Sequence, residues 1–422
     1  MRNLIKFSSI IFVSFLFSFP LLNAQWEECN NGLGTRTIYC FLVDGNNIYA
    51  GTDAGVYMSS DNGDNWIDKN IGLKELYGQG NFGVYSLAII GHNIFAGTAL
   101  HGIFLSTDKG DNWERKSNGL PYILNGQDTL FRFFVNALTI NGNNIFAGTD
   151  IGVYLSTDNG GTWNLKNYGL PQLDTFKTKY RDVWSFAIIG NNIFAGTRSG
   201  VYQSTDNGDS WFSKNKGIEN WAVFSLAING NNIYAGVDYE GVFQSTNNGE
   251  NWKYIGLKDT TISALITKGN YIFAAGHGVD ISTNNGKNWI VKKSGLTCFG
   301  TGSLIINGDY IFAGDAICGI FRAKLSDLGI TAVKEAEQKN VCIIYPNPAN
   351  TSFRLKYNSE VETQVQLSIY DCLGNEVLNL TENCVVGTNE KTIDCSRLST
   401  GYYFVKVRCG ADVQTQGLVI IK

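Results

Sequence analysis

The sequence predicts an all-β protein: a seven-bladed β-propeller followed by a small C-terminal β-sandwich of the Ig-like kind. One short apolar phrase recurs seven times before residue 325. The composition, with 13% aromatic and 17% charged residues and 48 glycines, suits short apolar strands joined by turns. After residue 324 the repeat stops, and a charged linker (325–340) leads to alternating apolar segments of another pattern (341–422).

The recurring phrase reads Asn-Ile-Tyr/Phe-Ala-Gly in its full form, and its spacing of roughly 40–50 residues is typical of propeller blades. Its copies are Asn47–Gly51, Asn93–Gly97, Asn144–Gly148, Asn192–Gly196, Asn232–Gly236, Tyr271–Gly276 and Tyr310–Gly314. An apolar run and a turn rich in Gly and Asn precede each copy, and another short apolar segment follows it. We therefore predict that the phrase is the second strand of a repeating unit.

A second phrase, Ser-x-Asp/Asn-x-Gly-x-x-Trp, follows six of the copies. It occupies Ser59–Trp66, Ser106–Trp113, Ser156–Trp163, Ser204–Trp211, Ser245–Trp252 and Ser282–Trp289. Ser, Asp and Gly at this spacing are typical of a tight turn, in which Asp bonds to the backbone and Gly takes a positive φ. One unit is thus predicted to have four antiparallel strands, a to d, with this turn between c and d.

Two neighbouring positions in the first strand of each unit differ in size. The bulky one is Phe41, Leu87, Leu138, Phe186, Leu226, Leu265 and Leu304, and the small one is Cys40, Ser86, Ala137, Ser185, Ser225, Ala264 and Ser303. Successive side chains of a strand point to opposite faces, so each sheet has a bulky face and a flatter face. Sheets of this kind can pack face to face around a ring without helices.

The two ends of the repeat complement each other. The seventh unit stops after its third strand, whereas Gln25–Leu33 has the Trp and Asn-Gly-Leu spacing of a fourth strand. We predict that this N-terminal strand completes the seventh blade, which leaves no free edge in the ring. Cys29 and Cys318 would then share one blade, and we predict a disulfide bond between them.

These Ser-x-Asp-x-Gly-x-x-Trp phrases resemble the Asp-box (BNR) repeats of sialidases, some glycoside hydrolases, sortilin-type receptors and photosystem assembly-factor-like proteins. The resemblance covers residues 25–324 and implies a propeller. Two of the six boxes depart from it by carrying Asn247 and Asn284 in place of Asp. Because the relatives include enzymes and non-enzymes, the resemblance implies no particular activity.

The first 24 residues have the pattern of a secretory signal peptide. Arg2 and Lys6 are followed by an apolar stretch, Ile10–Leu22, and by Ala24 before the expected cut at Gln25. The alternative is a membrane anchor, although Ser14, Ser18 and Pro20 interrupt the stretch. No later segment has the length of apolar sequence that a spanning helix needs, so we expect no transmembrane segment in the mature chain.

The C-terminal module, residues 341–422, resembles the type IX (Por) secretion C-terminal sorting domain. The phrases that carry the resemblance are Tyr345–Asn350, Ile369–Gly374, Leu398–Val407 and Leu418–Lys422. The resemblance implies passage across the inner and outer membranes of a Gram-negative bacterium, with the type IX machinery as a partner of this module. It also implies release from the cell or attachment to its surface. An ordinary carbohydrate-binding sandwich is the alternative that the composition allows.

Charge and cysteine content exclude several other classes. The net charge of −4 lacks the basic excess expected of a nucleic-acid partner. The nine cysteines and three histidines show no spacing of a zinc site, and the box turns lack the ligand spacing of an EF-hand. We therefore predict no metal site and no cofactor. Nine is an odd number, so at least one cysteine is unpaired or pairs with another chain.

We expect the functional site on the face that holds the b–c turns and the d–a connections, which we call the loop face. Three d–a connections are long, and long loops on a rigid scaffold commonly carry function. The candidate ligand-binding residues are the aromatic and cationic ones there: Tyr77, Tyr122, Arg132, Tyr180, Arg181, Trp184 and Trp221. A polysaccharide or a surface protein is the ligand class that such a rim suits.

A secreted glycoside hydrolase is the alternative function. It would use a pair of carboxylates on the loop face, for which Asp53, Asp150 and Asp182 are the candidates. Asp53 and Asp150 lie in Gly-Thr-Asp-x-Gly turns and have a structural explanation as well. No Arg-Ile-Pro phrase of a sialidase and no Gly-x-Ser-x-Gly elbow occurs in the chain. A non-catalytic binding propeller is therefore the preferred prediction.

Overall fold

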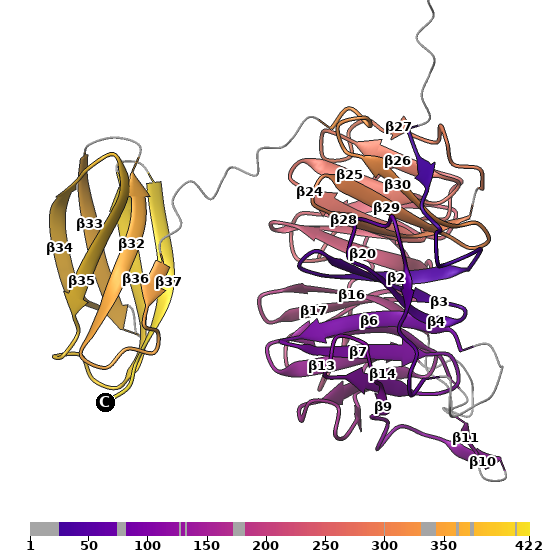
Figure 1. The fold of residues 1–422 in the computed structure, drawn as a ribbon, viewed down its shortest axis with the longest axis horizontal. Coiled ribbons are helices and arrows are strands. Elements are labelled where there is room, and N and C mark those ends of the chain that lie inside the picture. The colour runs from indigo at the N-terminus through magenta and orange to yellow at the C-terminus, as the bar shows by residue number, and fades with distance from the viewer. Residues whose placement is uncertain are drawn as a thin grey trace, which may run out of the picture. The chain divides into compact units, whose positions relative to one another are not determined.

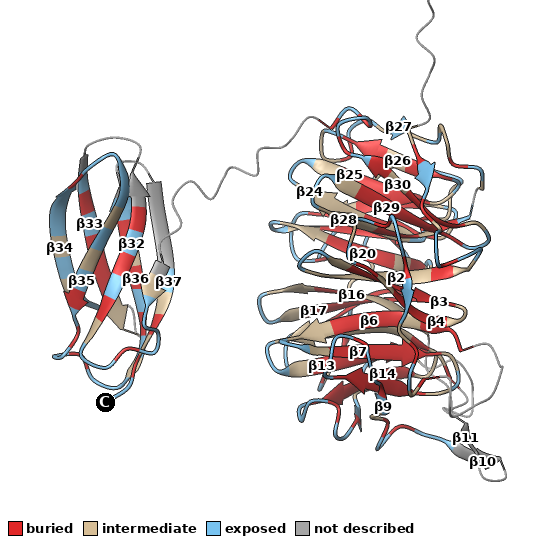
Figure 2. Ribbon diagram, viewed as in Figure 1, coloured by how far each residue is buried: buried red, intermediate tan, exposed pale blue. Residues whose placement is uncertain are grey.

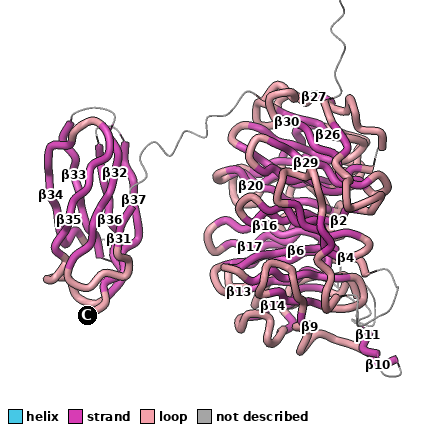
Figure 3. Tube along the Cα trace, in the orientation of Figure 1, coloured by secondary structure: helices cyan, strands magenta, loops and turns pink. Residues whose placement is uncertain are grey.

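A computed structural model describes residues 25–73, 82–125, 128–130, 133–171, 182–298, 300–330, 343–359, 363–371, 375–409 and 412–422. The predicted signal peptide and most of the predicted linker lie outside these residues. The chain divides into two compact units, Met1–Thr331 and Ala332–Lys422, and the described residues of both are strands and turns without helix (Figures 1 and 3). No helix that could span a membrane occurs in this described part.

The first unit contains seven four-stranded antiparallel sheets, as predicted. We number them in chain order, and strands a to d of each run from the inside of the ring outward. The strands of sheets 1 to 3 are β2 (Ile38–Asp44), β3 (Asn47–Thr52), β4 (Gly55–Ser59), β5 (Ile67–Asp68); β6 (Val84–Ile90), β7 (Asn93–Thr98), β8 (Ile103–Ser106), β9 (Glu114–Arg115); and β12 (Val135–Asn141), β13 (Asn144–Thr149), β14 (Gly152–Ser156), β15 (Asn164–Leu165).

The remaining sheets follow the same order. The strands of sheets 4 to 7 are β16 (Val183–Ile189), β17 (Asn192–Thr197), β18 (Gly200–Ser204), β19 (Phe212–Ser213); β20 (Val223–Asn229), β21 (Asn232–Val237), β22 (Gly241–Ser245), β23 (Lys253–Gly256); β24 (Ala264–Lys268), β25 (Tyr271–Ala275), β26 (Val279–Ser282), β27 (Ile290–Val291); and β28 (Thr301–Asn307), β29 (Tyr310–Asp315), β30 (Gly319–Lys324), β1 (Glu27–Glu28). A separate hairpin, β10 (Ile123–Asn125) and β11 (Asp128–Leu130), projects from the connection between sheets 2 and 3 (Figure 1).

The sheets form a closed ring. Their inner strands contact one another in the order β2, β6, β12, β16, β20, β24 and β28, and β28 contacts β2 again. Sheet 7 takes its fourth strand from the N-terminus, because Glu27 pairs with Arg322 and Glu28 with Phe321. This is the strand arrangement that the sequence predicts, and it leaves sheet 7 with the same four strands as the others.

The recurring phrase is buried because its residues lie where neighbouring sheets meet (Figure 2). Its glycine permits a close approach of two backbones: a Cβ on Gly51 would lie 2.6 Å from the carbonyl oxygen of Val84 in the next sheet. Ser86 of the small column donates its hydroxyl to the carbonyl of Val135 at 2.9 Å. Phe186 of the bulky column packs in the other direction, against Phe146 of the preceding sheet.

Each of the six box tryptophans, and Trp26 at the equivalent position of the N-terminal segment, joins its sheet to the preceding one. The indole N–H donates to a backbone carbonyl there over 2.7–2.9 Å. The pairs are Trp66 to Cys29, Trp113 to Lys69, Trp163 to Lys116, Trp211 to Lys166, Trp252 to Lys214, Trp289 to Ile255 and Trp26 to Lys292. A buried indole that lacks an acceptor would destabilise the fold, so these bonds accompany the apolar packing.

The second unit is a β-sandwich. One sheet has the order β31 (Ile343–Tyr345), β32 (Ser352–Ser359), β35 (Gly387–Asp394), and the other β34 (Glu376–Cys384), β33 (Thr363–Asp371), β36 (Gly401–Cys409), β37 (Asp412–Ile420). Their facing side chains, among them Phe353, Leu355, Ile369 and Val405, form one buried core. The two sheets packed face to face are the predicted sandwich architecture.

Candidate functional site at the mouth of the central channel

A channel of about 350 Å³ lies at the centre of the propeller, lined by residues of the inner strands of all seven sheets. Each inner strand begins at the loop face, because the d–a connection leads into it. The small and bulky positions line the channel along its length, and the residue just before them lies at its loop-face mouth. That mouth is the candidate functional site.

The inner strands share an irregularity at this mouth. In six of the seven sheets the pairing of strands a and b shifts by one residue, which leaves a residue of strand a without a pairing partner. The skipped residues are Tyr39, Tyr85, Asn136, Trp184, Phe224 and Gly302. A bulge of this kind re-aims its side chain, and each of these six residues lines the channel.

Four of the skipped residues are aromatic and stack in pairs between neighbouring sheets. The rings of Tyr39 and Tyr85 are 4.1 Å apart at an angle of 13°, and those of Trp184 and Phe224 are 4.4 Å apart at 24°. Phe134, just before β12, adds an edge contact to Tyr85 at 5.4 Å. Burial, together with the hydrogen bond to Tyr85, raises the pKa of Tyr39, so the Tyr39 hydroxyl stays protonated at neutral pH.

Sheet 1 adds two unpaired polar atoms at the same edge. Asp53 follows β3, and its backbone N–H donates to Thr37 at 3.1 Å, beside Arg36. The Oδ1 atom of Asp53 and the Nε atom of Arg36 are both buried without a hydrogen-bond partner among the described residues. Buried polar atoms are normally hydrogen-bonded, so an acceptor and a donor without partners are unusual here.

The other two candidate carboxylates have positions of their own. Asp150 follows β13 in sheet 3, and its Oδ1 accepts a hydrogen bond from the backbone N–H of Phe134 at 3.1 Å. Asp182 precedes β16 in sheet 4 and lies 3.8 Å from the guanidinium of Arg198. The three candidate acids therefore belong to three different sheets around the mouth.

Of the predicted ligand-binding residues, Trp184 belongs to the aromatic rim of the channel. Trp221, on the loop face of sheet 5, packs instead on Phe243 with 37% of its surface exposed. Tyr122 is also exposed, in the connection between sheets 2 and 3. Tyr77, Arg132, Tyr180 and Arg181 lie outside the described residues. Tyr39, Tyr85, Phe134 and Phe224 are not among the residues predicted from the sequence, although all but Phe134 directly precede the small column.

The box turns are structural. In the first, Oδ1 of Asp61 accepts bonds from the Ser59 hydroxyl at 2.8 Å and the Asn65 N–H at 2.9 Å. Its Oδ2 accepts from the Asn65 amide at 2.8 Å, and these bonds lower the pKa of the carboxyl. The loop geometry itself thus engages both oxygens of the carboxylate.

The predicted Cys29–Cys318 disulfide is wrong. Cys318 is bonded to Cys298, with their Cα atoms 6.2 Å apart. Cys29 is a free thiol whose pKa burial raises to about 12. The two cysteines do share sheet 7, but Cys29 lies near Gly63 and Phe312, between sheets 7 and 1. Cys318 lies in the b–c turn, within reach of the connection that carries Cys298.

Asp315 lies beside this disulfide in sheet 7. Its carboxylate accepts hydrogen bonds from the backbone N–H groups of Gly300, Ile317 and Cys318 over 2.8–3.0 Å. With the two sulfurs it forms a group close enough to hold a metal ion. However, the disulfide and these three bonds already engage the atoms that would be ligands, so the group serves to fix the loop.

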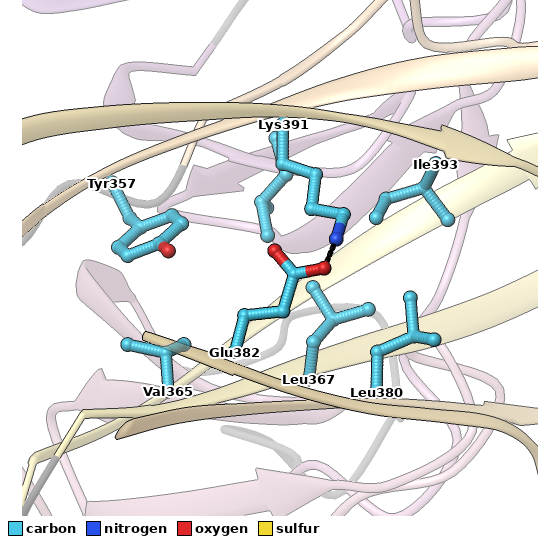
Figure 4. A pocket seen from close by; sticks show the side chains of 8 residues that line it. Tyr357, Val365, Leu367, Leu380, Glu382, Lys391 and Ile393 are labelled. Carbon is cyan, nitrogen blue, oxygen red and sulfur yellow. Dashed lines mark ion pairs between the residues drawn. The ribbon is translucent and has the colours of Figure 1, made fainter. Parts of the chain in front are cut away.

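A second cavity lies inside the C-terminal sandwich (Figure 4). It has a volume of about 10 Å³, and Leu367, Leu380 and Ile393 are among the apolar residues around it. Glu382 and Lys391 form an ion pair beside it, between β34 and β35. Such a volume holds about one water molecule, so it is a packing defect and not a ligand site.

In the C-terminal module, residues 343–422 match the family model of the secretion system C-terminal sorting domain. This module is a type IX sorting domain. It directs the chain through type IX secretion to the cell surface or outside the cell, so the propeller is an extracellular or surface protein. The sorting module is also the part of the chain through which the secretion machinery recognises it. No curated protein matches the sequence.

Solved structures confirm the propeller fold. The extracellular domain of BT4673 from B. thetaiotaomicron matches with a TM-score of 0.58 at 16% identity, over 81% of this chain and 45% of that one. YCF48 bound to the D1 peptide matches with a TM-score of 0.53 at 15% identity, over 71% of this chain and 97% of that one. An ancestral GH74 enzyme matches with a TM-score of 0.52 at 17% identity, over 69% of this chain and 48% of that one. This chain thus spans less than half of the first and third proteins, and the likeness is one of fold.

Proposed function

We propose that the propeller is a non-catalytic binding module that takes a glycan or protein ligand at the mouth of its channel. The observation that supports this most strongly is the group of five partly buried aromatic residues there: Tyr39, Tyr85, Phe134, Trp184 and Phe224. Aromatic side chains offer a ligand large apolar surface, and the tyrosine hydroxyls and the indole N–H add hydrogen bonds. Delivery outside the cell suits a protein that captures an external ligand.

The alternative, a glycoside hydrolase, requires a pair of carboxylates on either side of the bond that breaks. Asp150 accepts a bond from the Phe134 backbone, and Asp182 lies near the Arg198 guanidinium. Both interactions have an evident role in holding the loops around the mouth. Asp53 alone has a buried oxygen without a partner, and one such carboxylate is more readily explained by ligand binding than by catalysis.

The test measures binding of the purified full chain to a panel of plant, host and microbial polysaccharides, and to proteins of a cell-surface extract. Tyr85→Ala and Trp184→Ala are expected to weaken binding at least tenfold, about 1.4 kcal/mol. Phe212→Ala is the matched control, because this aromatic side chain is 59% exposed on the outer strand β19. Circular dichroism checks that all three variants are folded.

Two results would overturn this proposal. One is binding that survives both rim substitutions unchanged, because the ligand would then lie elsewhere. The other is release of reducing ends from a polysaccharide that is lost in Asp53→Asn, Asp150→Asn or Asp182→Asn. That second result would establish the hydrolase in place of the binding module.

A further inference from the structure

The rim of the channel is not uniform around the ring. Sheets 1, 2, 4 and 5 present aromatic side chains, and Phe134 lies beside Asn136 in sheet 3. The equivalent positions in the last two sheets are Ser263 and Gly302. Among the described residues, which do not include Phe299, the aromatic rim is therefore a crescent, with a low sector over sheets 6 and 7.

This low sector is open and held in place. A Cβ on Gly302 would have only the Ile38 carbonyl oxygen within reach, at 4.0 Å, and Ser263 is exposed. The loops of sheet 7 around it are fixed by the Cys298–Cys318 disulfide and by the bonds to Asp315. The opening is thus a permanent feature of the described structure and needs no moving lid.

The unpaired polar atoms lie at one end of this opening. Sheet 1 follows sheet 7 around the ring, and the Thr37 hydroxyl donates to the Ala316 carbonyl at 2.6 Å to join them on the loop face. Asp53 and Arg36 are both only partly buried, so their carboxylate and guanidinium groups provide an acceptor and a donor next to the low sector, beside the buried Oδ1 and Nε atoms that lack partners. A sugar hydroxyl can donate to the first and accept from the second, and two neighbouring hydroxyls can do both.

The backbone at the mouth favours a sugar over an extended peptide. A peptide that adds to a sheet edge needs a regular row of N–H and C=O groups on the edge strand. The register shifts interrupt that row in six of the seven inner strands, at the residues nearest the mouth. Stacked rings beside polar atoms without partners remain as the means of recognition, and these suit a pyranose ring.

We propose that the channel mouth binds the end of a linear glycan, and that the rest of the glycan chain leaves across Ser263 and Gly302. The terminal sugar lies within the aromatic crescent, and Asp53 and Arg36 bond its hydroxyls or those of the next sugar. In the other directions, most of the described rim positions carry a bulky aromatic ring, which narrows the way out. This inference rests on the proposed binding function and adds the class of ligand, its orientation and its exit.

The test fills the opening. In Gly302→Trp an indole occupies the low sector, and Ser263→Trp does so from the neighbouring sheet in case the first variant does not fold. Asn307→Trp is the matched control, because it adds the same bulk to the other end of strand β28, away from the loop face. Binding is measured on the polysaccharides of the panel and on fragments made from them by partial acid hydrolysis.

We expect both blocking variants that fold to bind at least tenfold more weakly than the wild type, and Asn307→Trp to bind as the wild type does. We also expect the fragments to compete in proportion to their number of chain ends and not to their total sugar. Unchanged binding by a folded blocking variant, or competition that follows total sugar, would overturn the inference. If binding then still depends on Tyr85 and Trp184, the proposed function stands without it. If the propeller instead captured proteins that carry no glycan, and this capture depended on Tyr85 and Trp184, the glycan ligand would be rejected and the proposed binding function would stand.

Discussion

The indole nitrogen of Trp26 donates a hydrogen bond to the backbone carbonyl of Lys292 at 2.8 Å, across a sequence separation of 266 residues. The other box tryptophans make the same bond to the sheet before them, over separations of 34–47 residues. Trp26 therefore belongs to the repeat in space, although it lies at the other end of the propeller sequence. Its bond joins sheet 7 to sheet 6 through the N-terminal segment.

Replacing Trp26 tests how much this contact stabilises the propeller. Trp26→Phe keeps most of the apolar contact but leaves the Lys292 carbonyl without its donor, so we expect a loss of about 1–2 kcal/mol in the free energy of unfolding. Trp26→Ala also creates a cavity, and we expect a loss of about 3–5 kcal/mol. Urea unfolding measures both. Trp163→Phe is the control, since it removes the same bond within the continuous chain; a loss of stability there with none in Trp26→Phe would show that the Trp26 bond does not help to hold the ring.

The repeat made the architecture predictable. Seven copies of one phrase, a bulky and a small column, and a missing fourth strand are all visible as residue types at fixed spacing. Each has a direct structural counterpart: the four-stranded sheets, the packing of Phe186 on the preceding sheet, and the pairing of β1 with β30. These features depend on local alternation and on repetition, which a sequence records.

The aromatic crescent was only partly predictable, because a register shift changes the direction of one side chain without changing the pattern of residue types. Simple alternation from Phe41 does not predict the position of Tyr39, because the register shift leaves Tyr39 out of the pairing between β2 and β3, and its ring stacks on Tyr85 at the mouth of the channel. The cysteine pairing failed for a related reason. A shared sheet brings Cys29 and Cys318 near each other, but the direction of each side chain decides the bond, and Cys29 points between two sheets.

The box turns can be tested for whether their Asp residues only stabilise the turn or also bind a metal ion. Asn247 and Asn284 accept the same backbone bonds as Asp61 does, at 3.0 and 2.9 Å. We therefore expect Asp61→Asn to change the free energy of unfolding by less than about 0.5 kcal/mol, and Asp61→Ala to lower it by about 1–2 kcal/mol. Thermal unfolding with and without EDTA measures this. A fall in Tm on chelation in the wild type but not in Asp61→Asn would show that the turn holds a cation.

Asp280 gives sheet 6 a pH-dependent stability. The other six sheets have Tyr or Phe at its position, for example Phe243 and Phe321. Its Oδ1 is buried without a partner among the described residues, and burial raises its pKa to about 6, against the opposing effect of Lys293. The folded protein thus holds this proton more tightly than the unfolded chain does. The cost of ionisation is absent below about pH 4 and is complete above pH 6.

Asp280→Asn removes that cost. We expect the variant to be more stable than the wild type by about 1–2 kcal/mol at pH 7–8, after allowance for partial exposure to solvent, and equally stable near pH 4. Urea unfolding at the two pH values provides the comparison. A gain in stability that is the same at both would mean that the amide improves packing and that ionisation has no part in it.

Because sheet 7 contains a disulfide bond, we expect a reductant to lower the stability of the propeller. It closes a loop with a sequence separation of 20 residues, and its loss is expected to cost about 3 kcal/mol. The double variant Cys298→Ser/Cys318→Ser should therefore have a lower Tm than the wild type and a smaller further drop when a reductant is added. Cys29→Ala is the control and should keep the response of the wild type. If it were Cys29→Ala that lost the response, the bond would involve Cys29.

The last prediction concerns how the sorting module presents its final strand. The side chain of Asn347 donates to the Gly417 carbonyl and accepts from the Val419 N–H, both at 2.9 Å, and so holds the 345–350 loop against β37. The same two segments are joined by the Ala349 N–H, which donates to Val419 at 2.8 Å. Because Asn347 makes both of its bonds to one strand, its loss should loosen that strand while the core of the sandwich, around Val405 and Ile369, stays intact.

Secretion should therefore depend on Asn347 if the machinery recognises this edge in its folded form. We expect Asn347→Ala to lower the amount of protein outside the cell several-fold and to raise the amount in the periplasm, as measured by immunoblot of the separated fractions. Asn379→Ala is the matched control, because the side chain of this exposed asparagine donates to Glu376 on its own strand. Normal export of Asn347→Ala, with hydrogen exchange showing that β37 has opened, would mean that sorting reads another surface of the module. Normal export with β37 still protected would show instead that the backbone bonds of Ala349 suffice to hold the strand.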